Sequence, residues 1–256
     1  MHAALNGAVF QLRLLRRSPG DLMALATTPL MTVIFLAIVH HGARPDLEAN
    51  AVLAPALIAL WGMSLLIAGD MIDVERENGT LEALIAAPTS LWPLLTGRIA
   101  VVTSVSLLGL AESWCVAKFA FGVTLTLGSP TVFVFALIAT VFAMSGWAGV
   151  MSSLFVLSRS ARIFQNSLSF PFYILGGVLV PVALLPGFLQ PLSHAVFLSW
   201  SSDLLRESLL SEAPRAPLLR ILVIVLLGAA GGLLGRGLLA VVLNRARTTG
   251  TISFGS

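Results

Sequence analysis

An uncharged run of forty residues extends from Phe119 to Ser158 and contains no Asp, Glu, Lys or Arg. A helix of roughly 20 residues crosses a bilayer core about 30 Å thick, so this run is too long for one span. Gly128, Ser129 and Pro130 supply a turn within it. Of all residues, 57% are apolar and 11% are charged, whereas soluble domains carry about one quarter charged residues. The chain is therefore predicted to fold in a membrane.

The apolar runs are continuous rather than alternating, which favours helices over a strand barrel. We predict an all-α membrane protein with six transmembrane helices, forming a single domain over residues 1–256. The N-terminal residues 1–20 repeat Leu5, Val9 and Leu12 at helical spacing beside basic residues, which is typical of an amphipathic helix on the membrane surface. The spans are expected at about 22–41, 51–69, 99–121, 131–157, 168–186 and 218–243.

The distribution of arginine predicts the orientation of the six spans. Ten arginines lie on the side that holds both termini and four lie on the other side. Because Lys and Arg accumulate in cytoplasmic segments, both termini and residues 70–98 are expected in the cytoplasm. The arginines are scattered rather than clustered, so we expect no nucleic-acid partner.

The acidic segment before the third span reads as a short helix. Thr80 is a suitable cap, Glu82 lies in the first turn where the helix dipole favours an anion, and Pro88 ends the helix. Leu81, Leu84 and Ile85 share one face. A short surface helix with one apolar face is suited to docking another protein, and a solvated loop is the alternative.

The stretch ERENGTLEALIAAPTSLWPLLTGRI, residues 75–99, resembles the cytoplasmic loop of type-2 ABC exporter permeases. Its pattern is carried by Glu75, Arg76, Glu77, Gly79, Thr80, Leu81, Glu82, Pro88, Trp92, Gly97 and Arg98. Residues 170–191 resemble the fifth span of that family and the Leu-Pro-Gly start of its outer re-entrant hairpin, which would occupy residues 187–217 here. Residues 203–209, DLLRESL, resemble the helix that ends this hairpin, although the preceding Asn-Pro is replaced by Val196 and Phe197.

The resemblance implies the membrane half of a transporter, placed in the bacterial plasma membrane. A coupling helix between spans two and three would dock on a separate ABC ATPase, of which each complex holds two copies. The coupling residues would be Glu75, Arg76, Glu77, Gly79, Thr80, Leu81, Glu82, Leu84 and Ile85. A second permease, identical or related, would complete the pathway.

The chain lacks the machinery for ATP hydrolysis. A phosphate-binding loop needs a lysine after a glycine-rich turn, but the only lysine, Lys118, follows no such turn. We therefore expect a permease rather than an enzyme, with ATP and magnesium bound by the partner ATPase and no catalytic, cofactor or metal site in this chain. The apolar interior favours a hydrophobic or amphiphilic substrate such as an antibiotic, drug or lipid. A polysaccharide or teichoic-acid exporter is the alternative.

Six residues are candidates for the substrate path or the outer gate. Glu112 is an ionisable residue within a span, where such groups often face a cavity; a protonated carboxyl or a hydrogen bond between helices is the structural alternative. The other five are aromatic residues in or near the fifth span, which anchoring at the membrane interface explains as well: Phe170, Phe172, Tyr173, Phe188 and Trp200.

Two other classes of protein remain as alternatives. A channel or secondary carrier would also have several spans but would leave the acidic segment without a role. A rhomboid-like intramembrane protease would use Ser145 and His194. That class needs Gly-x-Ser-Gly, whereas Ala143 occupies the first position here, and His194 precedes the sixth span instead of lying in it.

Overall fold

The computed structural model describes residues 2–17, 23–77, 79, 91–157, 161–210 and 213–249. Within these ranges the regular structure is entirely helical, which confirms the predicted all-α class. Two short 3-10 turns accompany the helices, η2 (Pro45–Leu47) and η3 (Val182–Leu184). The helices are α1 (His2–Arg17), α2 (Met23–His41), α3 (Glu48–Glu77), α5 (Leu91–Ser106), α6 (Leu108–Phe121), α7 (Pro130–Leu157), α8 (Ala161–Leu175), α9 (Gln190–His194), α10 (Phe197–Ser208) and α11 (Pro217–Thr249).

Four helical stretches in the described residues are long and apolar enough to cross a membrane. They are Pro45–Leu65, Trp92–Phe121, Pro130–Leu154 and Pro217–Val242. The apolar stretch Leu25–His41 is shorter, and α8 has 15 residues. These lengths agree with a multi-pass helical protein, and the count of six spans stays a prediction.

The expected fifth span, residues 168–186, is wrong at both of its boundaries. The helix there is α8, which begins at Ala161 and ends at Leu175. Gly177 has a positive φ of 63° and forms a Schellman ending, in which its N–H donates to the carbonyl of Ile174 and the N–H of Val178 donates to that of Tyr173. The chain then continues without a regular α-helix until α9 begins at Gln190.

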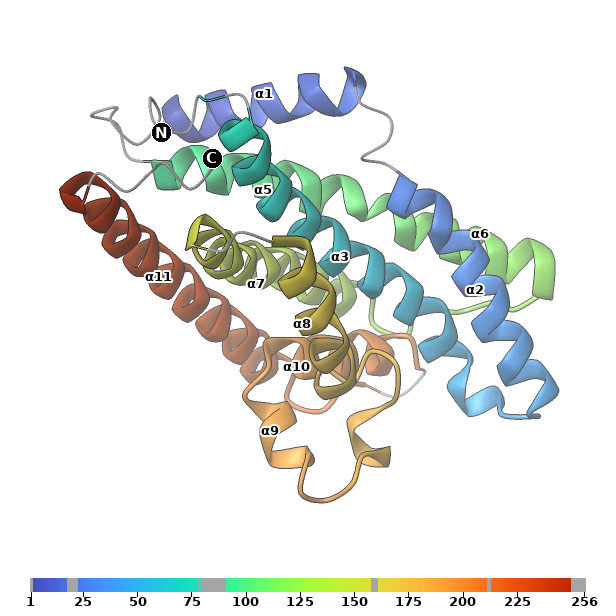
Figure 1. Ribbon diagram of the computed structural model, residues 1–256. Coiled ribbons are helices and arrows are strands. Elements are labelled where there is room, and N and C mark those ends of the chain that lie inside the picture. Colours follow the sequence, from blue (N-terminus) through green and yellow to red (C-terminus); the bar gives the residue numbers. More distant parts are fainter. Residues whose placement is uncertain are drawn as a thin grey trace.

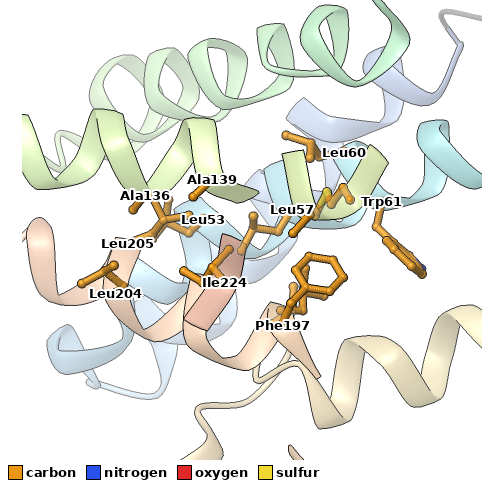
Figure 2. Close-up of a cluster of buried hydrophobic side chains, with 14 of the residues drawn as sticks. Leu53, Leu57, Leu60, Trp61, Ala136, Ala139, Phe197, Leu204, Leu205 and Ile224 are labelled. Carbon is orange, nitrogen blue, oxygen red and sulfur yellow. The ribbon is translucent and has the colours of Figure 1, made fainter. Parts of the chain in front are cut away.

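Helix α3 lies at the centre of the fold. It contacts α2, α5, α6, α7, α8 and α10, whereas α11 packs mainly along α7. Figure 2 shows part of the main core, in which side chains from α3, α7, α10 and α11 meet. The labelled members are Leu53, Leu57, Leu60 and Trp61 from α3, Ala136 and Ala139 from α7, Phe197, Leu204 and Leu205 from α10, and Ile224 from α11.

Small residues allow α7 and α11 to approach closely. A Cβ atom at Gly228 would lie 2.5 Å from Cα of Ala143, and one at Gly235 would lie 2.8 Å from the carbonyl carbon of Gly149. Ser153 donates its hydroxyl to the carbonyl of Gly235 at 2.9 Å across the same interface. Small residues and side-chain hydrogen bonds are what hold helices together in lipid, where hydrophobic burial between helices supplies little.

The two ends of the bundle differ. Helix α1 lies across one end, where α5 begins and α11 ends, and α9 with its flanking segments lies at the opposite end (Figure 1). The first end holds the N-terminal helix and the start of α5. The second end holds the turn after α8 and the helix α10.

Candidate functional site

The predicted coupling segment lies between α3 and α5. Helix α3 continues to Glu77 instead of ending near residue 69, so Glu75, Arg76 and Glu77 belong to its last turn. Gly79 is exposed, has a φ of 66°, and has no atom within 4 Å of a Cβ placed on it. Five further coupling residues lie outside the described residues, and their predicted role stays untested: Thr80, Leu81, Glu82, Leu84 and Ile85.

Helix α5 follows this segment directly and is tightly bound to α1. It begins at Leu91, ahead of the expected start of the third span near residue 99. The backbones nearly touch, because a Cβ at Gly7 would lie 2.5 Å from the carbonyl oxygen of Leu94, and one at Gly97 would collide with the carbonyl of Ala4. Such an approach requires glycine on both helices.

A buried arginine joins the same two helices. The guanidinium of Arg98 donates Nε–H to Oε1 of Gln11 at 2.9 Å, and both residues are at least 95% buried. The Arg98 guanidinium also lies 5.0 Å from the ring centroid of Phe10, within the range of a cation–π contact. We call this junction of α1 and α5, formed by Gly7, Phe10, Gln11, Gly97 and Arg98, the α1–α5 brace.

Helix α1 turns its apolar stripe away from the protein. Leu5, Val9 and Leu12 are between 45% and 56% exposed, whereas Gln11 and Leu15 are buried against the neighbouring helices. No part of the described chain covers this stripe, and the neighbouring face of α1 docks on α5. This arrangement agrees with the predicted helix at the membrane surface. The sequence indicates the exposed apolar stripe but gives little signal for the polar docking face.

At the opposite end of the bundle, α10 holds the turn that ends α8. Ser202 donates its hydroxyl to the carbonyl of Gly176 at 2.7 Å, and Arg206 donates to the carbonyl of Gly177 at 2.7 Å. Arg206 also pairs with Asp203 at 3.0 Å. Burial raises the pKa of the Asp203 carboxyl, and the positive charge of Arg206 opposes this shift. These bonds fix α10 against the end of α8.

The aromatic residues predicted to form a substrate path do not form one cluster. Phe170 and Phe188 are 65% and 74% exposed. Tyr173 is buried and donates its hydroxyl to the carbonyl of Ile58 on α3 at 3.2 Å. Trp200 donates Nε1–H to the carbonyl of His194 and so ties α10 to α9. Only Phe172 reaches an interior aromatic group.

That interior group was missed in the sequence, because its members come from four separate helices. Phe172 on α8 stacks on Trp61 of α3, with ring centroids 4.9 Å apart and planes 24° apart. Phe197 of α10 lies 6.0 Å from Trp61, and Trp147 of α7 lies 6.3 Å from Phe172. We call Trp61, Trp147, Phe172 and Phe197 the aromatic cluster. The sequence shows only that each of these four positions carries a large aromatic side chain. It does not indicate that the four side chains meet.

Glu112 lies on α6 away from this cluster. The carboxylate oxygen Oε2 is buried and has no hydrogen-bond partner among the described residues. Its neighbour Ser113 provides the hydrogen bond between helices, accepting from the hydroxyl of Thr32 on α2 at 2.9 Å. The structure therefore does not bring Glu112 together with the aromatic candidates.

The serine of the protease alternative makes a local contact. Ser145 donates its hydroxyl to the carbonyl of Val141 within α7 at 2.8 Å. Its neighbours Gly146 and Gly149 pack against α11, which agrees with a packing role for this stretch. His194 ends the short helix α9 at one end of the bundle.

Comparison with known families decides the class of the protein. The family described as "ABC-2 type transporter" matches residues 8–210, which include the aromatic cluster, α10 and every residue of the α1–α5 brace except Gly7. The chain belongs to this family. As an ABC-2 permease it is the membrane component of an ABC transporter, and the protease alternative is thereby dismissed.

Two curated relatives resemble this permease over part of their length. Both carry the name "Probable multidrug ABC transporter permease YbhR", one from Escherichia coli strain K12 and one from Escherichia coli O157:H7. Each is 23% identical over 178 residues, which cover 69% of this chain and 48% of the relative. The permease thus spans about half the length of the curated relatives it matches.

Proposed function

We propose that this permease forms the membrane pathway of an ATP-driven exporter for hydrophobic or amphiphilic compounds, such as drugs or lipids. Two copies of a separate ATPase bind ATP and magnesium, and a second permease, identical or related, completes the pathway. The complex lies in the bacterial plasma membrane with both termini of the permease in the cytoplasm. The observation that carries the proposal is the family match over residues 8–210 together with the Gly-Thr-Leu-Glu segment between α3 and α5.

The α1–α5 brace supports a coupling role for this segment. A force applied between Glu77 and Leu91 acts on the end of α3 and the start of α5. Helix α3 contacts α8 and α10, which form the opposite end of the bundle, and α5 is fixed to the surface helix α1. Docking of an ATPase at this segment would therefore move the central helix of the permease against a helix held at the membrane surface.

The substrate class rests on the apolar interior and on the printed name of the relatives, which describes them as multidrug permeases. The interior aromatic cluster is suited to flat apolar groups. Export of a polysaccharide or teichoic acid is the second candidate, because the loop resemblance is shared with those exporters. The two are distinguished by which compound stimulates ATP hydrolysis by the complex.

The first test is co-purification from the natural host. A tagged permease is expected to bring down an ABC ATPase, and Leu84→Asp is expected to lose it, because a charge would enter the apolar face of the coupling helix. The matched control is Leu127→Asp, which places the same change in an exposed segment before α7. Retention of the ATPase by Leu84→Asp, or its absence from the natural complex, would contradict the proposal. A carrier would continue transport without any ATPase.

A further inference from the structure

Trp61 carries a hydrogen-bond donor for which the described part of the fold offers no acceptor. The residue lies near the middle of α3 and is fully buried, and its Nε1–H has no partner among the described residues. A buried tryptophan N–H normally has an acceptor. Trp147 on α7 follows that rule, since it donates to the carbonyl of Leu227 at 3.1 Å. The unused donor of Trp61 is therefore an exception within the same aromatic cluster.

The surroundings of this donor are flat and apolar. Phe172 covers the Trp61 indole in a stacked arrangement at 4.9 Å, and Phe197 lies beside it at 6.0 Å. Figure 2 shows Trp61 at the edge of the core cluster, apart from Leu204 and Leu205. An aromatic ring that took the place of Phe172 would keep this stacking. An oxygen at the edge of such a ring would accept the hydrogen bond that no group in the described part of the chain accepts.

Helix α8, which carries Phe172, is interrupted by a proline beside Trp61. Pro171 lies inside this helix and has no main-chain N–H, so one backbone hydrogen bond of the helix is missing. Phe170, on the other side of this proline, is 65% exposed. Because Phe172 is itself only partly buried, displacing its ring would open the Trp61 indole to the outside of the bundle.

We propose that Trp61 selects substrates: its Nε1–H donates to an oxygen acceptor on a flat aromatic compound that displaces Phe172. The ligand class is a planar aromatic molecule with a carbonyl or ether oxygen at its edge. This inference rests on the proposed export function for its biological use. Binding alone is sufficient to test it.

The test compares two probes that differ by one acceptor, fluorenone and fluorene. Radiolabelled forms of both are bound to the full permease in lipid nanodiscs, and empty nanodiscs give the background. The natural protein is expected to prefer fluorenone. In Trp61→Phe this preference should fall about tenfold, the effect of losing one hydrogen bond. A general loss of packing weakens both probes and cancels in their ratio.

Trp147→Phe is the matched control, because Trp147 touches the same Phe172 but has its N–H satisfied. It is expected to leave the ratio of affinities unchanged. The inference is overturned if Trp61→Phe keeps the natural ratio, if Trp147→Phe lowers the ratio equally, or if neither probe binds above background. Binding with the expected ratio but without a co-purifying ATPase would support this site and contradict the proposed function instead.

Discussion

Arg98 is the residue whose environment differs most from what its position in the motif suggests. In the sequence it is one of the arginines that end the cytoplasmic segment, where a solvated charge is expected. In the structure it is 5% exposed and bonded to Gln11 of α1. A guanidinium tolerates such a place because its Nε–H donates to Gln11 while its flat face lies over the ring of Phe10. Arg98 therefore joins α5 to α1.

Replacing Arg98 by Met is expected to loosen α1 from α5. The change leaves the buried amide of Gln11 without its donor, and an unsatisfied buried polar group costs about 1–3 kcal/mol. Thermal unfolding of the purified permease measures the loss. Adding Gln11→Leu should recover part of it, because both sides of the contact are then apolar. A double variant that is less stable than the sum of the two single changes would contradict this account of the brace.

At the scale of helices, the α7–α11 interface depends on glycine at the contact and not on glycine in general. Gly228→Leu is expected to lower stability by about 1–3 kcal/mol, because its Cβ would lie 2.5 Å from Cα of Ala143. Gly237→Leu lies on the same helix with no atom within 4 Å of its Cβ, so it should change stability by less than about 0.5 kcal/mol. Equal effects of the two changes in a thermal unfolding assay would contradict the interface.

The helices themselves could be predicted, because apolar runs of membrane-spanning length have few other ways to satisfy their backbone. Three spans are expected to start at residues 22, 131 and 218. The helices α2, α7 and α11 start at Met23, Pro130 and Pro217, each within one residue of the prediction. The end of α8 could not be predicted from hydropathy, since the chain stays apolar beyond Leu175 and only the conformation of Gly177 ends the helix.

The contacts between helices were harder to predict than the helices. The docking face of α1 is formed by Gly7 and Gln11, which hydropathy does not mark as an interior surface. The aromatic cluster likewise joins residues from α3, α7, α8 and α10, and single-sequence reasoning has no measure of which apolar side chains meet. Only Phe172 belongs both to the predicted path and to this cluster.

For the whole molecule, the burial of two arginines bears on the orientation that their distribution predicts. Arg98 belongs to the α1–α5 brace, and Arg206 donates to the turn after α8. Neither arginine is therefore a solvated charge in a loop. Removing one from each side leaves nine arginines against three, and the bias toward a cytoplasmic location of the termini is unchanged.

The orientation is tested by cysteine labelling, which the chain makes simple because Cys115 is its only cysteine. In a Cys115→Ala background, Arg13→Cys on α1 should react with an impermeant maleimide only after the cells are opened. Thr126→Cys, in the exposed segment before α7, should react in intact cells. The reverse pattern would place the segment between α3 and α5 outside the cell. No cytoplasmic ATPase could then reach it, so this result would overturn the orientation and the coupling mechanism together.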